Sequence, residues 1–329
     1  MTTLYAALDR RLLSVRGAES DWTAREGLTD RAVRCVAASS AAPERVFAGT
    51  VDSGLLRSSD GGRRWTEVGS FSDRVTAVTV SPHDPDDVWV GTEPSVVYRS
   101  TDGGDSFAER GGLAELPCSD RWSYPPRPET HRVRWIAVNP HDPAHIYVAI
   151  EAGAFVRSVD GGRTWQPHPD GGRWDNHTLA THPDAPCRVY TAAGDGYAVS
   201  PDCGDTWQSP QEGLDHRYVW GLAVDPGDPE TVVVSAASDA DSAHRPGGAH
   251  AYVYRKSGPD DPWTVAMDGL PEPRGTVRAV LTAGNDGEFY ALTNRGLFCS
   301  EDGGQSWDEL PIEWPDSYCD QVGRGLAVV

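Results

Sequence analysis

An eight-residue pattern, S-x-D-x-G-x-x-[WF], occurs five times in the chain and constrains its fold more than any other feature. The copies cover residues 58–65, 100–107, 158–165, 200–207 and 300–307. Self-similarity at a regular period is the signature of repeat architectures, in which one supersecondary unit is copied through the molecule. The chain is therefore expected to be built from one repeated unit.

Each residue type in the pattern suits a tight turn between two antiparallel strands. The aspartate carboxylate can accept backbone N–H groups in an Asx-type turn, and the glycine can take a positive φ that other residues resist. The serine hydroxyl can close the loop from the first strand, and the aromatic ring on the second strand can pack back over the turn and the next repeat. Because structure accounts for every position, we do not expect these aspartates to be catalytic or to bind a metal. A calcium loop would also need alternating carboxylates.

The spacing of the aromatic residues predicts the number of repeats. Two further tryptophans, Trp22 and Trp263, follow strand-like segments but lack a complete pattern. With them, seven anchors stand at positions 22, 65, 107, 165, 207, 263 and 307, and four of the six spacings lie between 42 and 44 residues. In one repeat we expect four strands at 133–139, 146–150, 154–158 and 165–168. The chain is predicted to be an all-β, seven-bladed β-propeller of four-stranded antiparallel blades, with a single domain over residues 1–329.

The two ends of the chain are predicted to share a blade. Residues 323–329 look like an inner strand with no second strand after it, and residues 3–8 look like a second strand with no inner strand before it. Their pairing would close the ring and remove two exposed strand edges. Blade 1 is therefore expected to combine about residues 1–28 with about residues 320–329.

The repeated pattern resembles the Asp-box, or bacterial neuraminidase repeat (BNR), of the sialidase-like superfamily of β-propellers. Five good copies, spread over nearly the whole chain, make this resemblance specific. The resemblance implies a propeller whose Asp-boxes lie on the face opposite an active site and have no catalytic role. It leaves enzymatic activity open, because sialidases, sortilin-type receptors and other propellers share the repeat.

An alignment of the seven inner strands by their apolar pattern places one column of residues at one mouth of the central channel. The column contains Thr76 and six candidates for ligand binding, which are Arg34, Arg134, His177, Trp220, Arg278 and Arg324. Arginine presents a planar fork that suits carboxylate or phosphate, and several guanidiniums near one axis need anions beside them. One interpretation is an anion-binding mouth.

A structural interpretation of the same column is equally open. The arginines can pair with nearby carboxylates, for which Asp73, Asp175, Asp215 and Asp320 are the candidates. They can also wedge between blades, because alternate side chains of a strand point to opposite faces.

Two insertions are expected to reach the same mouth. They cover about residues 108–131, between two blades, and about residues 236–250, within a blade. Loops of this length often carry function. His244 and His250 share the second loop with Asp241, but two histidines in one loop are weak evidence for a metal site, so we expect neither a metal nor a cofactor. His83 and His141 fall in turns and are expected to be exposed.

Charge and cysteine content restrict the partners and the compartment. The formal net charge is −20 and Lys256 is the only lysine, a composition that resembles haloarchaeal cytosolic proteins and suggests a halophilic archaeal source. Nucleic acids and anionic membranes are not expected as partners, because both require a basic surface. No segment reads as a secretion signal or a membrane span, which predicts a cytoplasmic protein, and a closed propeller predicts a monomer. Cys187 and Cys203 belong to one blade and can approach each other, but a cytoplasmic protein favours free thiols.

Two functions remain open from the sequence. The first is a binding or assembly-scaffold propeller whose partner is an anionic small molecule, a glycan or an acidic protein segment. In architecture it resembles the assembly-factor propellers of photosystem II, which carry Asp-boxes and an arginine patch. The alternative is a sialidase-like or other glycoside hydrolase that acts on a carboxylated glycan.

The resemblance to sialidases implies an arginine cluster, a tyrosine nucleophile and an acid/base aspartate. Tyr124 or Tyr218, Asp175 and Asp320 are available for these roles. The chain lacks the Arg-Ile-Pro motif of sialidases, and its seven predicted blades are one more than sialidases typically have. No catalytic residue is therefore assigned.

Overall fold

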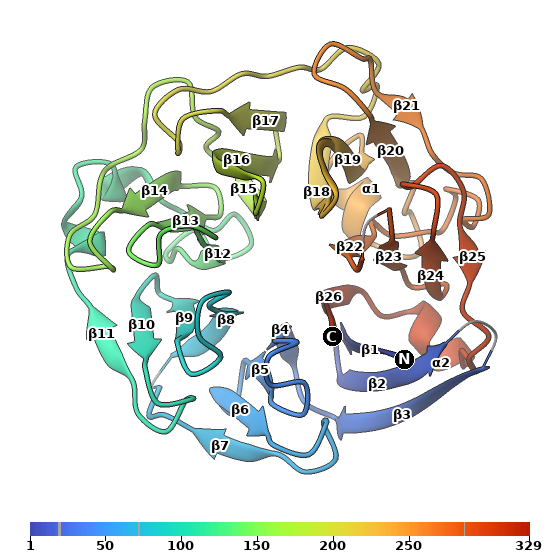
Figure 1. Ribbon diagram of the computed structural model, residues 1–329, viewed down its shortest axis with the longest axis horizontal. Coiled ribbons are helices and arrows are strands. Elements are labelled where there is room, and N and C mark those ends of the chain that lie inside the picture. Colours follow the sequence, from blue (N-terminus) through green and yellow to red (C-terminus); the bar gives the residue numbers. More distant parts are fainter. Residues whose placement is uncertain (19–20, 72, 286) are drawn as a thin grey trace.

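The chain folds into seven antiparallel sheets arranged radially around a central axis, as Figure 1 shows. The structure is a computed structural model that describes residues 1–18, 21–71, 73–285 and 287–329. Each sheet is one blade, with its inner strand beside the axis and its later strands towards the periphery. The prediction of an all-β, seven-bladed β-propeller is confirmed.

The blades follow one another in chain order. In blades 2 to 7 the strands run in sequence from the axis outwards, whereas blade 1 has the last strand of the chain at its inner position. Blade 1 contains β26 (Gly323–Val328), β1 (Thr2–Leu8), β2 (Arg11–Ala18) and β3 (Asp21–Thr29). Blade 2 contains β4 (Val33–Ala38), β5 (Val46–Thr50), β6 (Leu55–Ser58) and β7 (Thr66–Val68). Blade 3 contains β8 (Arg74–Val80), β9 (Val88–Glu93), β10 (Val97–Ser100) and β11 (Ala108–Arg110). Blade 4 contains β12 (Val133–Val138), β13 (Ile146–Ile150) and β14 (Ala154–Ser158).

Blade 5 contains β15 (Asn176–His182), β16 (Ala185–Ala193) and β17 (Gly196–Ser200). Blade 6 contains β18 (Tyr218–Asp225), β19 (Asp228–Ala237), β20 (Tyr252–Lys256) and β21 (Thr264–Val265). Blade 7 contains β22 (Val280–Ala283), β23 (Phe289–Leu292), β24 (Leu297–Ser300) and β25 (Asp308–Glu309). The helices are short: the 3₁₀ turns η1 (Leu113–Glu115) and η2 (Ser119–Arg121), and α1 (Ala240–His244) and α2 (Asp316–Cys319).

Blades 4 and 5 depart from the four-stranded pattern at their outer edge. In each, the fourth strand is reduced to a single bridge, between Arg157 and Gln166 in blade 4 and between Val199 and Gln208 in blade 5. The fourth strand expected at 165–168 is therefore present only as this contact. The other five sheets have four strands.

The ring closes through the two ends of the chain. Strand β26 pairs antiparallel with β1, with Leu4 opposite Val328 and Ala6 opposite Leu326. Figure 1 shows the N- and C-termini in the same blade. The predicted closure by the C-terminal strand is confirmed.

The five copies of the eight-residue pattern, which we call boxes, form turns that share one set of hydrogen bonds. In the first box, the Gly62 N–H donates to Ser58 Oγ and the Arg64 N–H donates to Asp60 Oδ1, both at 2.8 Å. The same bonds recur in the boxes of Asp102, Asp160, Asp202 and Asp302. At Asp160, the hydroxyl and the N–H of Thr164 lower the pKa of the carboxyl to about 2. These carboxylates are engaged by their own turns, as the residue types predict.

Two of the box tryptophans join neighbouring blades, whereas Trp65 donates to Gly62 O within its own box. The indole N–H of Trp165 donates to Gly111 O, and that of Trp307 donates to Ala266 O, both at 3.1 Å. Each acceptor lies at the outer edge of the preceding blade, whereas we expected the ring to pack over the next repeat. Trp263 of blade 6, where the pattern is incomplete, makes the same type of bond to Pro210 O, so its ring has the same structural role.

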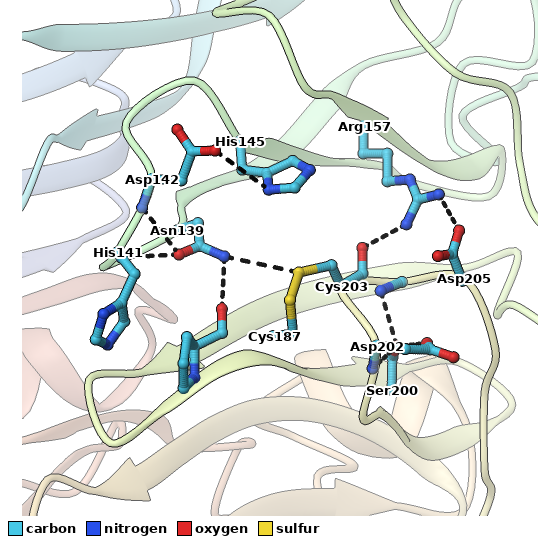
Figure 2. The surroundings of a disulfide bond; sticks show 12 residues. Asn139, His141, Asp142, His145, Arg157, Cys187, Ser200, Asp202, Cys203 and Asp205 are labelled. Atoms are coloured by element: carbon cyan, nitrogen blue, oxygen red, sulfur yellow. Dashed lines mark hydrogen bonds and ion pairs between the residues drawn. A yellow bond between two sulfur atoms is a disulfide. The ribbon is translucent and has the colours of Figure 1, made fainter.

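One box is tied covalently to its own blade. In the other four boxes the first glycine has a φ between +68° and +74°, and its N–H donates to a residue just before the second strand, as Gly161 does to Ala144 O. Blade 5 has Cys203 at this position, with a φ of +60° and an N–H bond to Cys187 O. A disulfide joins these two cysteines, as Figure 2 shows. The expectation of free thiols is wrong here, because the hydrogen bond common to all the boxes brings the two side chains together.

Removal of this disulfide is expected to destabilise the protein. The bond joins residues 16 positions apart, and a cross-link of this span contributes about 3 kcal/mol to the free energy of unfolding. The free energy of unfolding of the variant Cys187→Ser/Cys203→Gly should be about 1 kcal/mol higher than that of Cys187→Ser/Cys203→Ser, because glycine takes a positive φ at no steric cost. Urea denaturation of the two variants and of the oxidised wild type measures both differences. Equal stability of the two variants would contradict the role assigned to the backbone.

Candidate functional site

Six of the seven column positions are the extra residue of a β-bulge. In β4, Val33 pairs with Thr50 and Cys35 pairs with Gly49, so the intervening Arg34 has no partner. The same skip in register occurs at Thr76, Arg134, His177, Trp220 and Arg324. A bulge bends its strand and re-aims the extra side chain. With strict alternation, these side chains would be distributed between the blade interfaces. The bulges explain how they can instead converge on the axis.

The structure brings all seven column residues together around the axis. Arg34, Thr76, Arg134, Trp220 and Arg324 line, together with Arg132, a cavity that we call the ring cavity. The two remaining members lie against Trp220, since the His177 ring centroid is 4.2 Å from the indole and the Arg278 Cζ is 4.8 Å from it. Arg134 Cζ lies 4.7 Å from the same indole. Trp220 is therefore the shared contact of a cluster of cations.

Two members of the column have structural partners. The Thr76 hydroxyl donates to Val133 O, and His177 Nδ1 lies 2.7 Å from Val219 O. Each acceptor belongs to the inner strand of the next blade. His177 Nε2 also lies 3.4 Å from Asp175 Oδ1. Thr76 and His177 therefore link neighbouring blades.

The carboxylates that face the arginines were mostly missed by the sequence reasoning. Asp9 Oδ1 accepts from Arg324 Nε at 2.6 Å and lies 3.7 Å from Arg34 Nη1. Burial opposes ionisation of Asp9, but Arg324, the Val322 N–H and Arg34 hold its pKa below the ordinary value. Glu151, which is buried, accepts from Arg132 Nε at 2.6 Å.

A shared position could have identified these carboxylates. Asp9 follows β1, Glu151 follows β13 and Glu93 ends β9, so each stands at the end of the second strand of its blade. Of the four expected counter-ions, Asp175 lies at the cluster, whereas Asp215 and Asp320 are exposed. Glu93 accepts from Arg127 Nε at 2.7 Å, which ties the first insertion to blade 3.

Arg278 is fully buried and lacks a counter-ion at hydrogen-bonding distance. None of its three guanidinium nitrogens has an acceptor among the described residues. Burial, reinforced by Arg324 and Arg134, lowers the pKa of Arg278 well below its ordinary value. Because a guanidinium keeps its proton in proteins, this position holds a charge that is costly to bury alone. The cluster therefore favours an anion.

A larger pocket, which we call the mouth pocket, opens above the ring cavity and has a volume of about 360 Å³. Both insertions and three residues of the ring cavity line it; its residues are Tyr124, Pro125, Pro126, Arg132, Glu151, Asp175, Tyr218, Trp220, Ala240, Asp241, His244, Arg245 and Arg324. This volume is in the range of small-molecule sites. The pocket combines aromatic surfaces with cations, which suits a ligand that has both a flat face and a negative group.

The two insertions form opposite parts of this pocket. In the first, Tyr124 lies under Arg132, with Cζ 3.9 Å from the ring centroid. In the second, the ring of His244 in α1 lies 4.3 Å from that of Trp220. Burial raises the pKa of Tyr218, whose hydroxyl lies 3.3 Å from His244 Nε2, so the phenol stays protonated and can donate a hydrogen bond. Leu113 and Trp122 of the first insertion are buried in the core beside blade 4, which anchors that side.

The remaining candidate features are metal ligands, membrane spans and the histidines of the turns. Within the described residues, no group of three or more His, Cys, Asp and Glu side chains is placed to hold a metal ion. Over the same residues, no helix is long and apolar enough to cross a membrane. His83 and His141 are exposed, as predicted.

Comparisons with known proteins identify the fold. No family model and no curated protein sequence matches the chain. Among solved structures, a GH74 enzyme from Niastella koreensis matches with a TM-score of 0.69 and 16% identity over 91% of this chain and 51% of that protein. The GH74 xyloglucanase from Xanthomonas campestris matches with a TM-score of 0.62 and 16% identity over 84% of this chain and 47% of that protein. YCF48 bound to D1 peptide matches with a TM-score of 0.57 and 19% identity, over 84% of this chain and 81% of that protein.

The chain spans about half the length of these two GH74 enzymes. At these identities, the likeness shows a shared propeller fold. A shared fold does not determine function, which depends on the residues of the site.

Proposed function

We propose that the chain is an Asp-box (BNR) repeat propeller that binds an anionic ligand, or an acidic segment of a partner protein, at the mouth pocket. One observation carries the proposal: the pocket stands over a cluster in which Arg278 is fully buried without an acceptor among the described residues. Arg132 and Arg324 form part of the pocket lining, so a carboxylate or phosphate placed there would meet cations. The match to YCF48 bound to D1 peptide is consistent with a propeller of this fold acting as a binding protein.

A ligand screen by thermal shift tests this proposal. Sialic acid, uronates, phosphate esters and acidic peptides are compared in concentrated sodium chloride, which screens the net charge of −20 without adding a competing carboxylate. We expect at least one anion to raise the Tm, and Arg324→Ala, which removes a cation of the mouth pocket, to weaken its binding about ten- to hundredfold, since a charged hydrogen bond and its cation are lost. Arg64→Ala is the matched control, because the Arg64 side chain is 93% exposed in a box turn. Failure of every anion to raise the wild-type Tm would contradict the proposal.

A glycoside hydrolase is the second candidate, favoured by one observation. The mouth pocket contains Glu151 and Asp175 beside Tyr218, and glycosidases use paired carboxyl groups. Against it, Glu151 is held by Arg132. The side-chain contact of Asp175 with His177, together with the Ala152 N–H, lowers the pKa of Asp175 despite burial, which disfavours a general acid. Release of reducing sugar from xyloglucan or from a sialoside, abolished in Asp175→Asn, would support the hydrolase over the binding protein.

A further inference from the structure

The ring cavity and the mouth pocket differ in size by more than tenfold. The ring cavity has a volume of about 10 Å³, against about 360 Å³ for the mouth pocket. A cavity of this size accommodates about one water-sized sphere. A whole sulfate, phosphate or sugar carboxylate is larger than such a sphere, so the size of the ring cavity favours a single small atom or ion.

The charges around the ring cavity favour an anion over a water molecule. Five guanidiniums surround it or lie beside it, and they belong to Arg34, Arg132, Arg134, Arg278 and Arg324. Among the described residues, the carboxylates paired with this cluster are those of Asp9, Glu151 and Asp175, the last of which is in contact with His177. The cations therefore outnumber the carboxylates in a part of the molecule where Arg134 and Arg278 are buried.

Two of these guanidiniums have hydrogen-bonding capacity left over. Arg134 Nε and all three nitrogens of Arg278 are buried and have no acceptor among the described residues. Each nitrogen carries a proton that needs an acceptor. Of these two residues, Arg134 lines the ring cavity, so a compact anion there would meet its donor. The same anion would offset the charge of Arg278, which lies against Trp220.

We propose that the ring cavity binds a single halide ion, chloride in solution, held between the guanidiniums of Arg34, Arg134 and Arg324 with the charge of Arg278 beside it. This site lies below the mouth pocket and does not require an organic ligand there. The halide offsets the repulsion between arginines of different blades, so it stabilises the closed ring. A halide site therefore links the stability of the propeller to the anion in its solvent.

Bromide tests the site directly, because bromide replaces chloride and scatters anomalously. Crystals of the full chain grown in sodium bromide, and others grown in sodium gluconate, are measured at the bromine edge. We expect one anomalous peak in the ring cavity in bromide. A cavity that holds water or no density in bromide overturns the proposal.

Thermal melting tests the energetic consequence. The Tm is measured in sodium chloride and in sodium gluconate at equal ionic strength, because the large net charge makes stability depend on ionic screening itself. Strongly hydrated anions stabilise proteins non-specifically, so that effect favours gluconate. We expect the opposite order, with the Tm in chloride rising with the logarithm of its concentration, as for a ligand bound only by the folded state. A Tm in chloride that never exceeds the Tm in gluconate overturns the proposal.

Variants separate the halide site from the mouth pocket. Arg278→Met is expected to raise the Tm in gluconate, since it removes a buried charge that has no acceptor, and to weaken halide binding by about tenfold or more. Arg134→Met provides a second test if Arg278→Met fails to fold, and Arg64→Met is the exposed control. Equal chloride dependence in wild type and in both buried variants overturns the assignment of the arginines. Stabilisation by an organic anion, together with the absence of a bromide peak in the ring cavity, overturns the halide site and leaves the proposed function supported.

Discussion

Deletion of residues 323–329 is expected to abolish soluble, cooperative folding. These residues include β26, the inner strand of blade 1, which is paired along β1. Without it, the backbone edge of β1 would be exposed, together with side chains such as Leu4 and Leu8 that are now fully buried. The ring would also lose one of its seven inner strands and its closure. The combined loss should exceed the roughly 5–15 kcal/mol by which such a domain is stable.

Size-exclusion chromatography, circular dichroism and thermal melting of the truncated chain measure this outcome. The matched control is a circular permutant that keeps residues 323–329, with a short linker from Val329 to Met1 and new ends between Gly171 and Gly172, in the connection between blades 4 and 5, where Gly171 is exposed. The permutant should fold, because it keeps every strand of the propeller and its new ends lie in a loop. A truncated chain that is monomeric and melts cooperatively would show that closure by β26 is dispensable.

Replacement of Glu151 by alanine is expected to cost about 3–5 kcal/mol in the free energy of unfolding. Glu151 and Arg132 are buried, with their side chains 9% exposed each, and Arg134 Nε lies 4.0 Å from the same carboxylate. Removal of the carboxylate would leave two buried guanidiniums without that partner. Removal of both members of the pair, in Glu151→Ala/Arg132→Met, should be less harmful than Glu151→Ala alone, because the orphaned charge of Arg132 is also removed.

Urea denaturation of the single and double variants measures both effects. Glu44→Ala is the matched control, since Glu44 pairs with Arg16 at 3.2 Å with its side chain 51% exposed, and an exposed pair contributes only about 0–1 kcal/mol. If Glu151→Ala and Glu44→Ala cost the same, the buried pair would have no special role in holding blade 4 to the cluster.

The number and order of the blades could be predicted because the information is local. Each box is closed by hydrogen bonds within eight residues, such as those of Ser58 and Asp60, so the pattern that specifies the turn is contiguous in the sequence. The period between boxes then fixes the number of blades, and the unmatched strand at each end predicts the closure. The same period places the seven column residues one in each blade, which is why an alignment of inner strands could find them.

The environment of these residues could not be predicted in the same way. The bulges that aim Arg34 and Arg324 at the axis appear only when each inner strand is paired with its neighbour. The partners Asp9 and Arg324 stand at opposite ends of the chain and meet because β26 joins blade 1. The disulfide also escaped prediction, because it depends on how the box of blade 5 lies against β16 rather than on cysteine spacing.

The sequence by itself therefore determined the repeat, the seven blades, the closure and the presence of a cationic column. Only the tertiary structure decided which of those cations are compensated: Arg132 and Arg324 have carboxylates, whereas Arg278 has none at hydrogen-bonding distance among the described residues. The physical reason is that charge balance and desolvation depend on distances between side chains of different blades. Those distances exist only after the ring has closed around its axis.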